Sequence, residues 1–168
     1  MMNKTLPILI FGYGNLSRGD DALGPLLLEM IQERIELDSV EILNDFQLQI
    51  EHALDLEDRN LVLFIDASVA CNGAFDFREL EPAHDKSYTT HAMSPAAVLQ
   101  VYQTIKHQTP PPCFLLSIQG EQFELGSDLS PKARKNLQRA DQYAERLLKR
   151  PNVKIWRELA EKAFHHEE

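Results

Sequence analysis

The feature that most constrains this chain is a glycine-rich turn that ends in two adjacent acids. Asp20 and Asp21 follow an apolar run at residues 6–11 and a turn at residues 12–19, and they open an amphipathic stretch. Two carboxylates therefore lie where a first predicted strand is followed by a first helix, and in open α/β sheets ligands bind at that edge. A phosphate would need glycines and backbone N–H groups there, without acids. The turn thus indicates a metal ion, or a partner that carries one, rather than a nucleotide.

Apolar runs alternate with helical patterns along the whole chain. Buried strands are predicted at residues 6–11, 40–43, 61–67 and 113–118. Helical spacing or helix-start signals follow at residues 23–35, 50–56, 94–105 and 130–148. Pro151 then separates a last segment that carries Ile155, Trp156, Leu159, Ala163 and Phe164. The run at 61–67 is apolar almost throughout, as a parallel strand buried on both faces requires. We therefore predict an α/β fold with a mostly parallel sheet covered on both faces, in a single domain over residues 1–168.

Composition excludes several classes of partner. The formal net charge is −9, and such a surface repels nucleic acid and anionic lipid. Cys71 and Cys113 lie far apart and form no CxxC pair, which argues against a disulfide framework or a thiolate zinc site. The N-terminal apolar stretch is too short for a signal peptide, and no run approaches the roughly 18 apolar residues of a membrane span. We expect a soluble, cytoplasmic monomer that binds neither nucleic acid nor membrane.

Polar side chains fall at the ends of the predicted strands. Asp20 and Asp21 follow the first strand, Asp66 ends the central strand, and His91 lies shortly before the helix predicted to start at Ser94. Together they offer two or three carboxylate oxygens and one imidazole. This mixed set of ligands suits zinc, nickel, manganese or iron better than calcium or magnesium. The sequence therefore predicts a transition-metal site at this edge.

Each of these residues also has a simpler interpretation. Asp20 or Asp21 can cap the first helix, and Asp20 is the better N-cap, which leaves Asp21 as the better ligand. Asp66 can satisfy backbone donors in the next turn. A lone histidine such as His91 is a solvated loop residue, and we interpret three others in the same way, namely His52, His84 and His107. Only the co-location of Asp21, Asp66 and His91 at one edge favours metal binding.

Other kinds of site are poorly supported. The turn has the first two glycines of a dinucleotide-binding fingerprint, but serine replaces the third and two acids follow it. A pyrophosphate would meet negative charge there. The sequence contains no GxSxG elbow, HExxH helix or Walker A loop.

Three motifs stand at residues 12–25, 64–67 and 90–94, and the first of them consists of residues 12–15, 19–21 and 24–25. In this order they resemble the opening signature and the second and third motifs of the hydrogenase maturation endopeptidases, which process the large subunit of [NiFe]-hydrogenases. Two further blocks, at residues 47–51 and 120–130, resemble stretches found in part of the family. Order and spacing are preserved from about Ile8 to Ser130.

The resemblance implies a three-layer α/β/α fold and a nickel-recognising, catalytic trio at Asp21, Asp66 and His91. The first of these ligands is glutamate in some members of the family, and aspartate is an ordinary metal ligand as well. The implied activity is removal of a C-terminal peptide from a hydrogenase large-subunit precursor, with the nickel supplied by that precursor.

Two questions stay open at the level of sequence. The ion could polarise the scissile carbonyl or activate a water, or it could only position the chain while a carboxylate acts as general base. A metal chaperone or sensor on the same fold, which binds nickel without cleaving anything, would show the same motifs.

Overall fold

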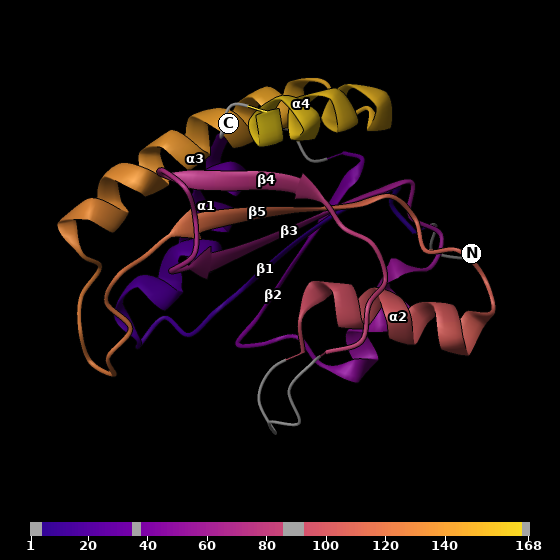
Figure 1. Ribbon diagram of the computed structural model, residues 1–168, viewed down its shortest axis with the longest axis horizontal. Helices are drawn as coiled ribbons and strands as arrows, with labels where there is room; N and C mark the ends of the chain where they lie inside the picture. The colour runs from indigo at the N-terminus through magenta and orange to yellow at the C-terminus, as the bar shows by residue number, and fades with distance from the viewer. Residues whose placement is uncertain (1–4, 35–37, 86–92, 166–168) are drawn as a thin grey trace.

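The computed structural model describes residues 5–34, 38–85 and 93–165, and this part of the chain forms a five-stranded sheet between helices (Figure 1). The strands are β1 (Ile8–Tyr13), β2 (Val40–Asp45), β3 (Leu61–Ser68), β4 (Phe75–Glu79) and β5 (Cys113–Gln119). Their order across the sheet is β2-β1-β3-β5-β4. All neighbours pair in parallel except β4, which is antiparallel to β5. The predicted α/β fold with a mostly parallel sheet is confirmed.

Alternation of side chains along the buried strands produces two separate cores. Ile8, Ile10, Leu63 and Ile65 face the layer that contains α1 (Leu23–Arg34), α3 (Pro131–Lys149) and α4 (Val153–His165). The opposite face of the same strands packs against η2 (Ile50–Leu56) and α2 (Pro95–Lys106), through side chains such as Leu9, Phe11, Val62 and Phe64. Figure 1 shows α3 and α4 on one side of the sheet and α2 on the other. The architecture is therefore three-layered, α/β/α.

Two helices begin where the sequence predicts. The hydroxyl oxygens of Ser94 and Ser130 each accept a hydrogen bond of 3.1 Å from the backbone N–H three residues later, at Ala97 and Ala133. A proline follows each serine at the first helical position. A serine N-cap of this kind stabilises a helix by about 1 kcal/mol relative to alanine.

Three strands differ from the prediction by two residues or more. β1 and β2 each continue two residues further, to Tyr13 and Asp45, because Gly12 and Tyr13 pair with Asn44 and Asp45. The edge strand β4 was not predicted. It has only five residues, and its antiparallel pairing with β5 holds it in place.

The single tryptophan of the chain fixes α4 to the sheet. Trp156 is fully buried, and its ring lies edge-on to Phe77 of β4 and Phe114 of β5. Its indole N–H donates to the carbonyl oxygens of Leu147 and Arg150, at 3.0 and 3.1 Å. The end of α3 and the start of α4 are thereby held over the β4–β5 end of the sheet.

Both cysteines are free and buried. Burial is also the main reason that the pKa of the Cys71 thiol is raised to about 11, so it is protonated at neutral pH. In the part of the chain that the structure describes, no helix combines the length and apolar character needed to cross a bilayer.

Candidate functional site

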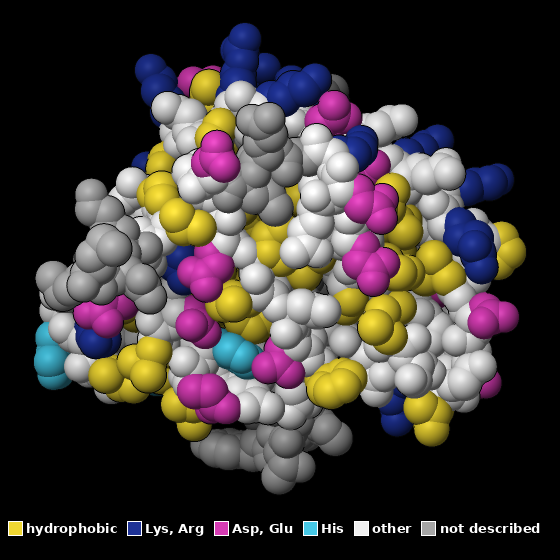
Figure 2. Space-filling view, turned by 180° about the vertical axis from the view of Figure 1, so that it is seen from behind, with side chains coloured by type: hydrophobic (Ala, Val, Ile, Leu, Met, Phe, Trp, Pro, Cys, Tyr) yellow, Lys and Arg dark blue, Asp and Glu magenta, His cyan; other side chains and the backbone are white. Residues whose placement is uncertain are grey.

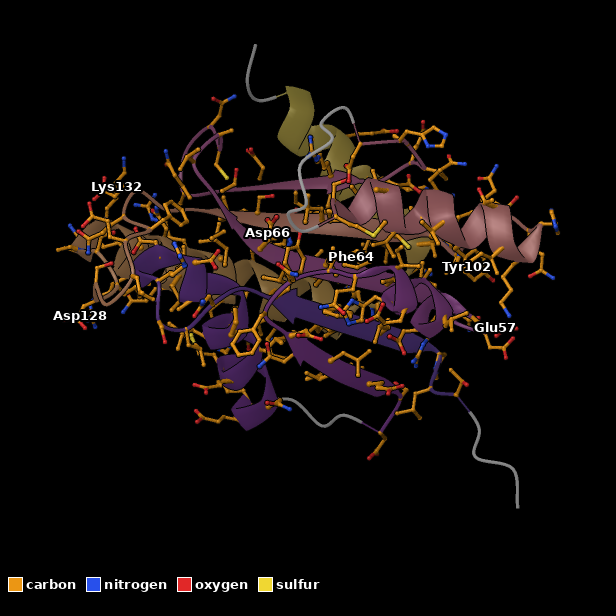
Figure 3. The ribbon with its side chains drawn as sticks, turned by 90° about the horizontal axis from the view of Figure 1, so that it is seen from below. Glu57, Phe64, Asp66, Tyr102, Asp128 and Lys132 are labelled. Carbon is orange, nitrogen blue, oxygen red and sulfur yellow. The ribbon has the colours of Figure 1, made fainter. Side chains whose placement is uncertain are left out.

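The strand order places the candidate site where β1 and β3 end side by side. From β1 the chain passes through α1 to β2 on one flank, and from β2 it returns to β3 on the other flank of β1. A reversal of this kind opens a crevice at the carboxyl ends of the strands, where ligands of open α/β sheets bind. Tyr13 ends β1 and Asp66 lies near the end of β3. The position of Asp66 along β3 relative to Phe64 can be followed in Figure 3.

Two glycines allow the first helical turn to approach this edge closely. A Cβ atom on Gly24 would lie 2.8 Å from the carbonyl oxygens of both Ile65 and Tyr13. A Cβ atom on Gly14, whose φ is +151°, would lie 2.0 Å from the carbonyl oxygen of Asp21. No side chain can be accommodated at such distances, so glycine is required at both positions. The glycine signature therefore brings Asp21 to the ends of β1 and β3.

Asp66 has one carboxylate oxygen engaged and one unpartnered. The Tyr13 hydroxyl donates a 2.8 Å hydrogen bond to Oδ2, whereas Oδ1 is buried and has no hydrogen-bond partner among the described residues. Burial raises the pKa of Asp66 to about 6, and the charge of Asp21 acts in the same direction. The hydroxyls of Tyr13 and Ser117 act in the opposite direction and lower this pKa. At neutral pH the group is therefore mostly ionised. It accepts no backbone N–H within the described residues, so the alternative that it only satisfies donors in the next turn is not supported.

Asp21 lies in the same electrostatic neighbourhood. Its Oδ2 accepts a 2.7 Å hydrogen bond from the backbone N–H of Asn15, which fixes the carboxylate against the glycine turn. Its charge contributes to the raised pKa values of both Asp66 and Tyr13. The charge of Asp21 thus reaches Asp66 at the end of the neighbouring strand.

The third predicted ligand, His91, lies outside the described residues. Within the described part of the chain, no three His, Cys, Asp or Glu side chains form a group that could hold a metal ion. The convergence of Asp21, Asp66 and His91 on one ion therefore stays a prediction.

Asp20 does not cap the first helix, so that prediction is wrong. The chain enters α1 through a short 3-10 turn, η1 (Gly19–Ala22), whose N-cap position is Arg18. The Asp20 carboxylate instead reaches across the molecule to the loop that follows β5. It accepts hydrogen bonds from the backbone N–H groups of Glu121, Gln122 and Ser130 and from the Ser130 hydroxyl, all at 2.7 to 3.0 Å.

These bonds make Asp20 the connection between the candidate site and the start of α3. The side chain is fully buried. Burial by itself would raise the pKa of Asp20, but the hydrogen bonds from Glu121, Ser130 and Gln122 outweigh it and hold the pKa below its usual value. Asp20 therefore serves the fold as an ionised, fully hydrogen-bonded carboxylate.

His52 is not a solvated loop residue, contrary to the prediction. Its Nδ1 accepts a 2.8 Å hydrogen bond from the backbone N–H of Gln49, and its Nε2 lies 3.2 Å from Oδ2 of Asp45. Its ring packs edge-on against Phe11, with centroids 4.6 Å apart. No local pattern indicates these contacts, because two of the partners come from β1 and the end of β2. The other two histidines, His84 and His107, are exposed as predicted.

Tyr13 is the residue of this edge that the sequence predictions missed. Burial and the neighbouring Asp66 raise its pKa well above the usual value, so the hydroxyl stays protonated and remains a donor. The available signal was its position, because a residue with a polar tip ends an apolar strand directly before Gly14.

Comparisons with known proteins support the fold. No protein-family model matches the sequence, and no curated protein matches it. Among solved structures, the [NiFe] hydrogenase maturation protease HycI from Thermococcus kodakarensis has a TM-score of 0.66 and 24% identity, over 86% of this chain and 93% of its own. The hydrogenase maturating endopeptidase HybD from E. coli has the same TM-score and identity, over 84% and 92%.

A more distant structure agrees with these two. The hydrogenase 2 maturation peptidase from Thaumarchaeota archaeon SCGC_AB-539-E09 has a TM-score of 0.61 and 19% identity, over 84% of this chain and 97% of its own. At these levels of identity the likeness shows a shared fold. The three-layer fold expected from the sequence motifs is thus the fold of solved hydrogenase maturation proteases.

Proposed function

We propose that this protein is an endopeptidase that removes a C-terminal peptide from the nickel-loaded precursor of a [NiFe]-hydrogenase large subunit. Asp21, Asp66 and His91 recognise the nickel, which the precursor brings as part of the substrate. The observation that carries this proposal is the free Oδ1 of Asp66, a buried carboxylate oxygen without a partner among the described residues. Burial of such an oxygen costs free energy unless a ligand, an ion or a water molecule supplies the missing partner.

The surroundings of Asp66 fit contact with a cation. Oδ2 accepts the hydroxyl of Tyr13, whereas the buried Oδ1 still lacks a partner among the described residues. Asp21 adds a second negative charge nearby, which disfavours ionisation of Asp66 in the absence of a cation. A metal ion in the precursor would offset both the burial of Asp66 and this repulsion, so binding is favoured when the precursor is loaded.

Hydrolysis then needs one base and one water. In the route that uses a carboxylate as base, the carboxylate takes a proton from the water as the oxygen adds to the scissile carbonyl carbon. The same proton passes to the leaving amine nitrogen as the C–N bond breaks, which gives a new carboxyl terminus and a free amine. If Asp66 is this base, its carboxylate has to leave the metal ion before it takes the proton, because contact with a cation lowers the pKa of a carboxyl group below the value of about 6 that Asp66 has in the free protein.

The test is cleavage of purified precursor, with and without nickel, followed by mass spectrometry. We expect wild-type protein to shorten only the nickel-loaded precursor. Asp66→Asn should abolish cleavage, and Asp58→Asn, a change of the same chemistry at an exposed position, should leave it intact. Binding of loaded precursor without any cleavage by wild-type protein would overturn the proposal in favour of a nickel chaperone or sensor.

A loss of activity in Asp66→Asn must not reflect misfolding. Because the folded-state pKa of Asp66 is raised to about 6, its ionisation destabilises the fold as the pH rises above the unfolded value of about 3.9, and the full effect is reached above the folded-state pKa. The effect of Asp66→Asn on stability therefore has a predictable sign. At pH 7.5 this variant, which carries no charge at the position, should resist urea at least as well as wild type. A variant that is inactive and clearly less stable would not count as support.

A further inference from the structure

The charge of this protein is strongly segregated. Residues 131–162, which span α3 and most of α4, contain ten Lys or Arg and four Asp or Glu, a formal charge of +6. The rest of the chain carries seven Lys or Arg against 22 Asp or Glu, a formal charge of −15. Figure 2 shows Lys and Arg side chains along the upper border of the molecule, and Asp and Glu side chains over its middle.

Four of the six basic residues of α3 lie along one side of the helix. Lys132, Lys135, Arg139 and Arg146, which we call the α3 basic stripe, follow one another at intervals of three, four and seven residues. Such intervals align side chains along one face of a helix, here over about 21 Å. All four residues are exposed. None of them forms an ion pair with a carboxylate in the described residues.

The stripe does not serve the helix itself. Lys135 and Arg139 lie four residues apart, and like charges at that spacing destabilise a helix by a few tenths of a kcal/mol. The two carboxylates of α3 are engaged elsewhere, because Asp141 and Glu145 both pair with Arg34 of α1. The stripe is therefore available to a partner with negative charge.

The position of the stripe connects it to the candidate site. α3 starts at Pro131, and its N-cap, Ser130, donates two hydrogen bonds to the carboxylate of Asp20, the neighbour of Asp21. Lys132 lies at this end of α3, as Figure 3 shows. A substrate whose scissile segment reaches Asp21 and Asp66 can therefore extend its body along the stripe.

A notch beside the far end of the stripe favours a protein partner over a polyanion. The lining of a hollow of about 330 Å³ there combines Ile155 and Leu159 of α4 with polar and charged residues, namely Gln142, Glu145, Arg146, Lys149 and Arg150. Apolar and charged groups side by side suit protein side chains, whereas a phosphate backbone gains nothing from the apolar ones. The net charge of the rest of the chain also repels extended polyanions.

We propose that the α3 basic stripe docks an acidic surface on the body of the hydrogenase precursor, while the C-terminal segment of the precursor enters the site at Asp21 and Asp66. This inference rests on the proposed function. Complementary charge outside the reacting centre acts mainly on the rate of association. The stripe therefore raises kcat/KM at low salt and leaves kcat unchanged.

The test compares two triple variants with the same change in net charge. The stripe variant loses three positive charges through Lys132→Gln, Lys135→Gln and Arg139→Gln, and glutamine is as good a helix former as the residues it replaces. The control variant gains three negative charges at exposed positions on α1, on α2 and just after α2, through Gln32→Glu, Gln103→Glu and Gln108→Glu. Cleavage of nickel-loaded precursor is measured at about 0.02 M and 0.5 M salt, since screening of exposed charges strengthens across that range.

We expect kcat/KM of the stripe variant to fall about tenfold or more at low salt, with kcat unchanged and with the control variant within about twofold of wild type. At high salt, where screening acts over a few ångströms, the difference should disappear. Equal kcat/KM for both variants at low salt, with active wild-type protein, would overturn the docking proposal and leave the proposed function standing. Wild-type protein that does not cleave the loaded precursor would overturn both.

Two further arms identify the kind of partner. Wild-type protein and the stripe variant are mixed with single-stranded DNA and with phosphatidylcholine–phosphatidylserine vesicles. We expect neither to bind in a stripe-dependent way. Binding of DNA or vesicles that is lost in the stripe variant, while precursor cleavage is unaffected, would show that the stripe serves a polyanion or a membrane and would refute the proposal.

Discussion

Replacement of Asp20 by asparagine should cost a large part of the stability of the fold. The Asp20 carboxylate accepts four hydrogen bonds, one at Oδ1 from the Ser130 N–H and three at Oδ2 from Glu121, Gln122 and the Ser130 hydroxyl. An asparagine has a single acceptor oxygen. If that oxygen takes the place of Oδ2, the amide NH2 faces the Ser130 N–H, so one bond is lost and a buried donor is left unsatisfied.

The magnitude follows from these losses. A hydrogen bond to a charged acceptor contributes about 1.5–3 kcal/mol, and a buried unsatisfied donor costs about 1–3 kcal/mol. Since the environment can relax, we expect Asp20→Asn to lower the free energy of unfolding by about 3 kcal/mol. For a chain of this size that corresponds to a fall of roughly 6–12 °C in Tm.

The assay is urea unfolding followed by circular dichroism, with Asp128→Asn as the matched control. Asp128 is in the same loop but is exposed, and exposed substitutions usually change stability by less than about 0.5 kcal/mol. A loss below about 1 kcal/mol for Asp20→Asn, similar to that of the control, would refute the reasoning.

The pH dependence gives a second check. Because the hydrogen bonds lower the folded-state pKa of Asp20, its contribution is fully present above the unfolded value of about 3.9 and is lost as the pH falls through the lowered folded-state pKa. The difference between wild type and Asp20→Asn should therefore stay constant from about pH 7 to about pH 5. It should shrink only at more acidic pH.

Four other predictions concern His91, Tyr13, His52 and the binding of nickel. His91→Ala should abolish cleavage of loaded precursor and change stability by no more than about 0.5 kcal/mol; unchanged processing would refute nickel recognition by this residue. Tyr13→Phe removes a donor that lowers the pKa of Asp66, so the acidic limb of the pH–rate profile should move to higher pH; an unmoved limb would count against Asp66 as the base. His52→Ala should lose about 2–3 kcal/mol in urea unfolding, since the contacts with Asp45, Gln49 and Phe11 disappear. The isolated protein should release added nickel to a chelator, as measured by metal analysis; tight retention would contradict nickel supplied by the precursor.

The parts of the fold that could be predicted from the sequence are those with local signals. The runs that form β3 and β5 are apolar and buried on both faces, so composition alone identifies them. Ser94 and Ser130 cap their helices through residues three positions away. In each case the atoms that fix the structure are close together in the chain.

The features that were missed depend on partners far away in sequence. β4 is held by pairing with β5, as between Phe75 and Ile118, and no pattern within its own five residues indicates such a partner. Aspartate is a residue type that often caps helices, but the groups that donate hydrogen bonds to the Asp20 carboxylate lie 101 to 110 residues further along the chain. The candidate site shows the same dependence. Asp66 was proposed from its position at a strand end, which is a local signal. The role of Tyr13 as a hydrogen-bond donor was missed, because its acceptor, Asp66, lies 53 positions away in the sequence.

The burial of Trp156 gives this protein a built-in optical reporter. The chain contains one tryptophan, and its indole lies in the apolar layer between α4 and the β4–β5 end of the sheet, on the face that contains α1 and α3. Its fluorescence should be blue-shifted in the native state and move to the red when that layer opens. The candidate site, at the ends of β1 and β3, does not include the indole. A single emission spectrum can therefore separate variants that have lost their fold from those that have lost only their chemistry.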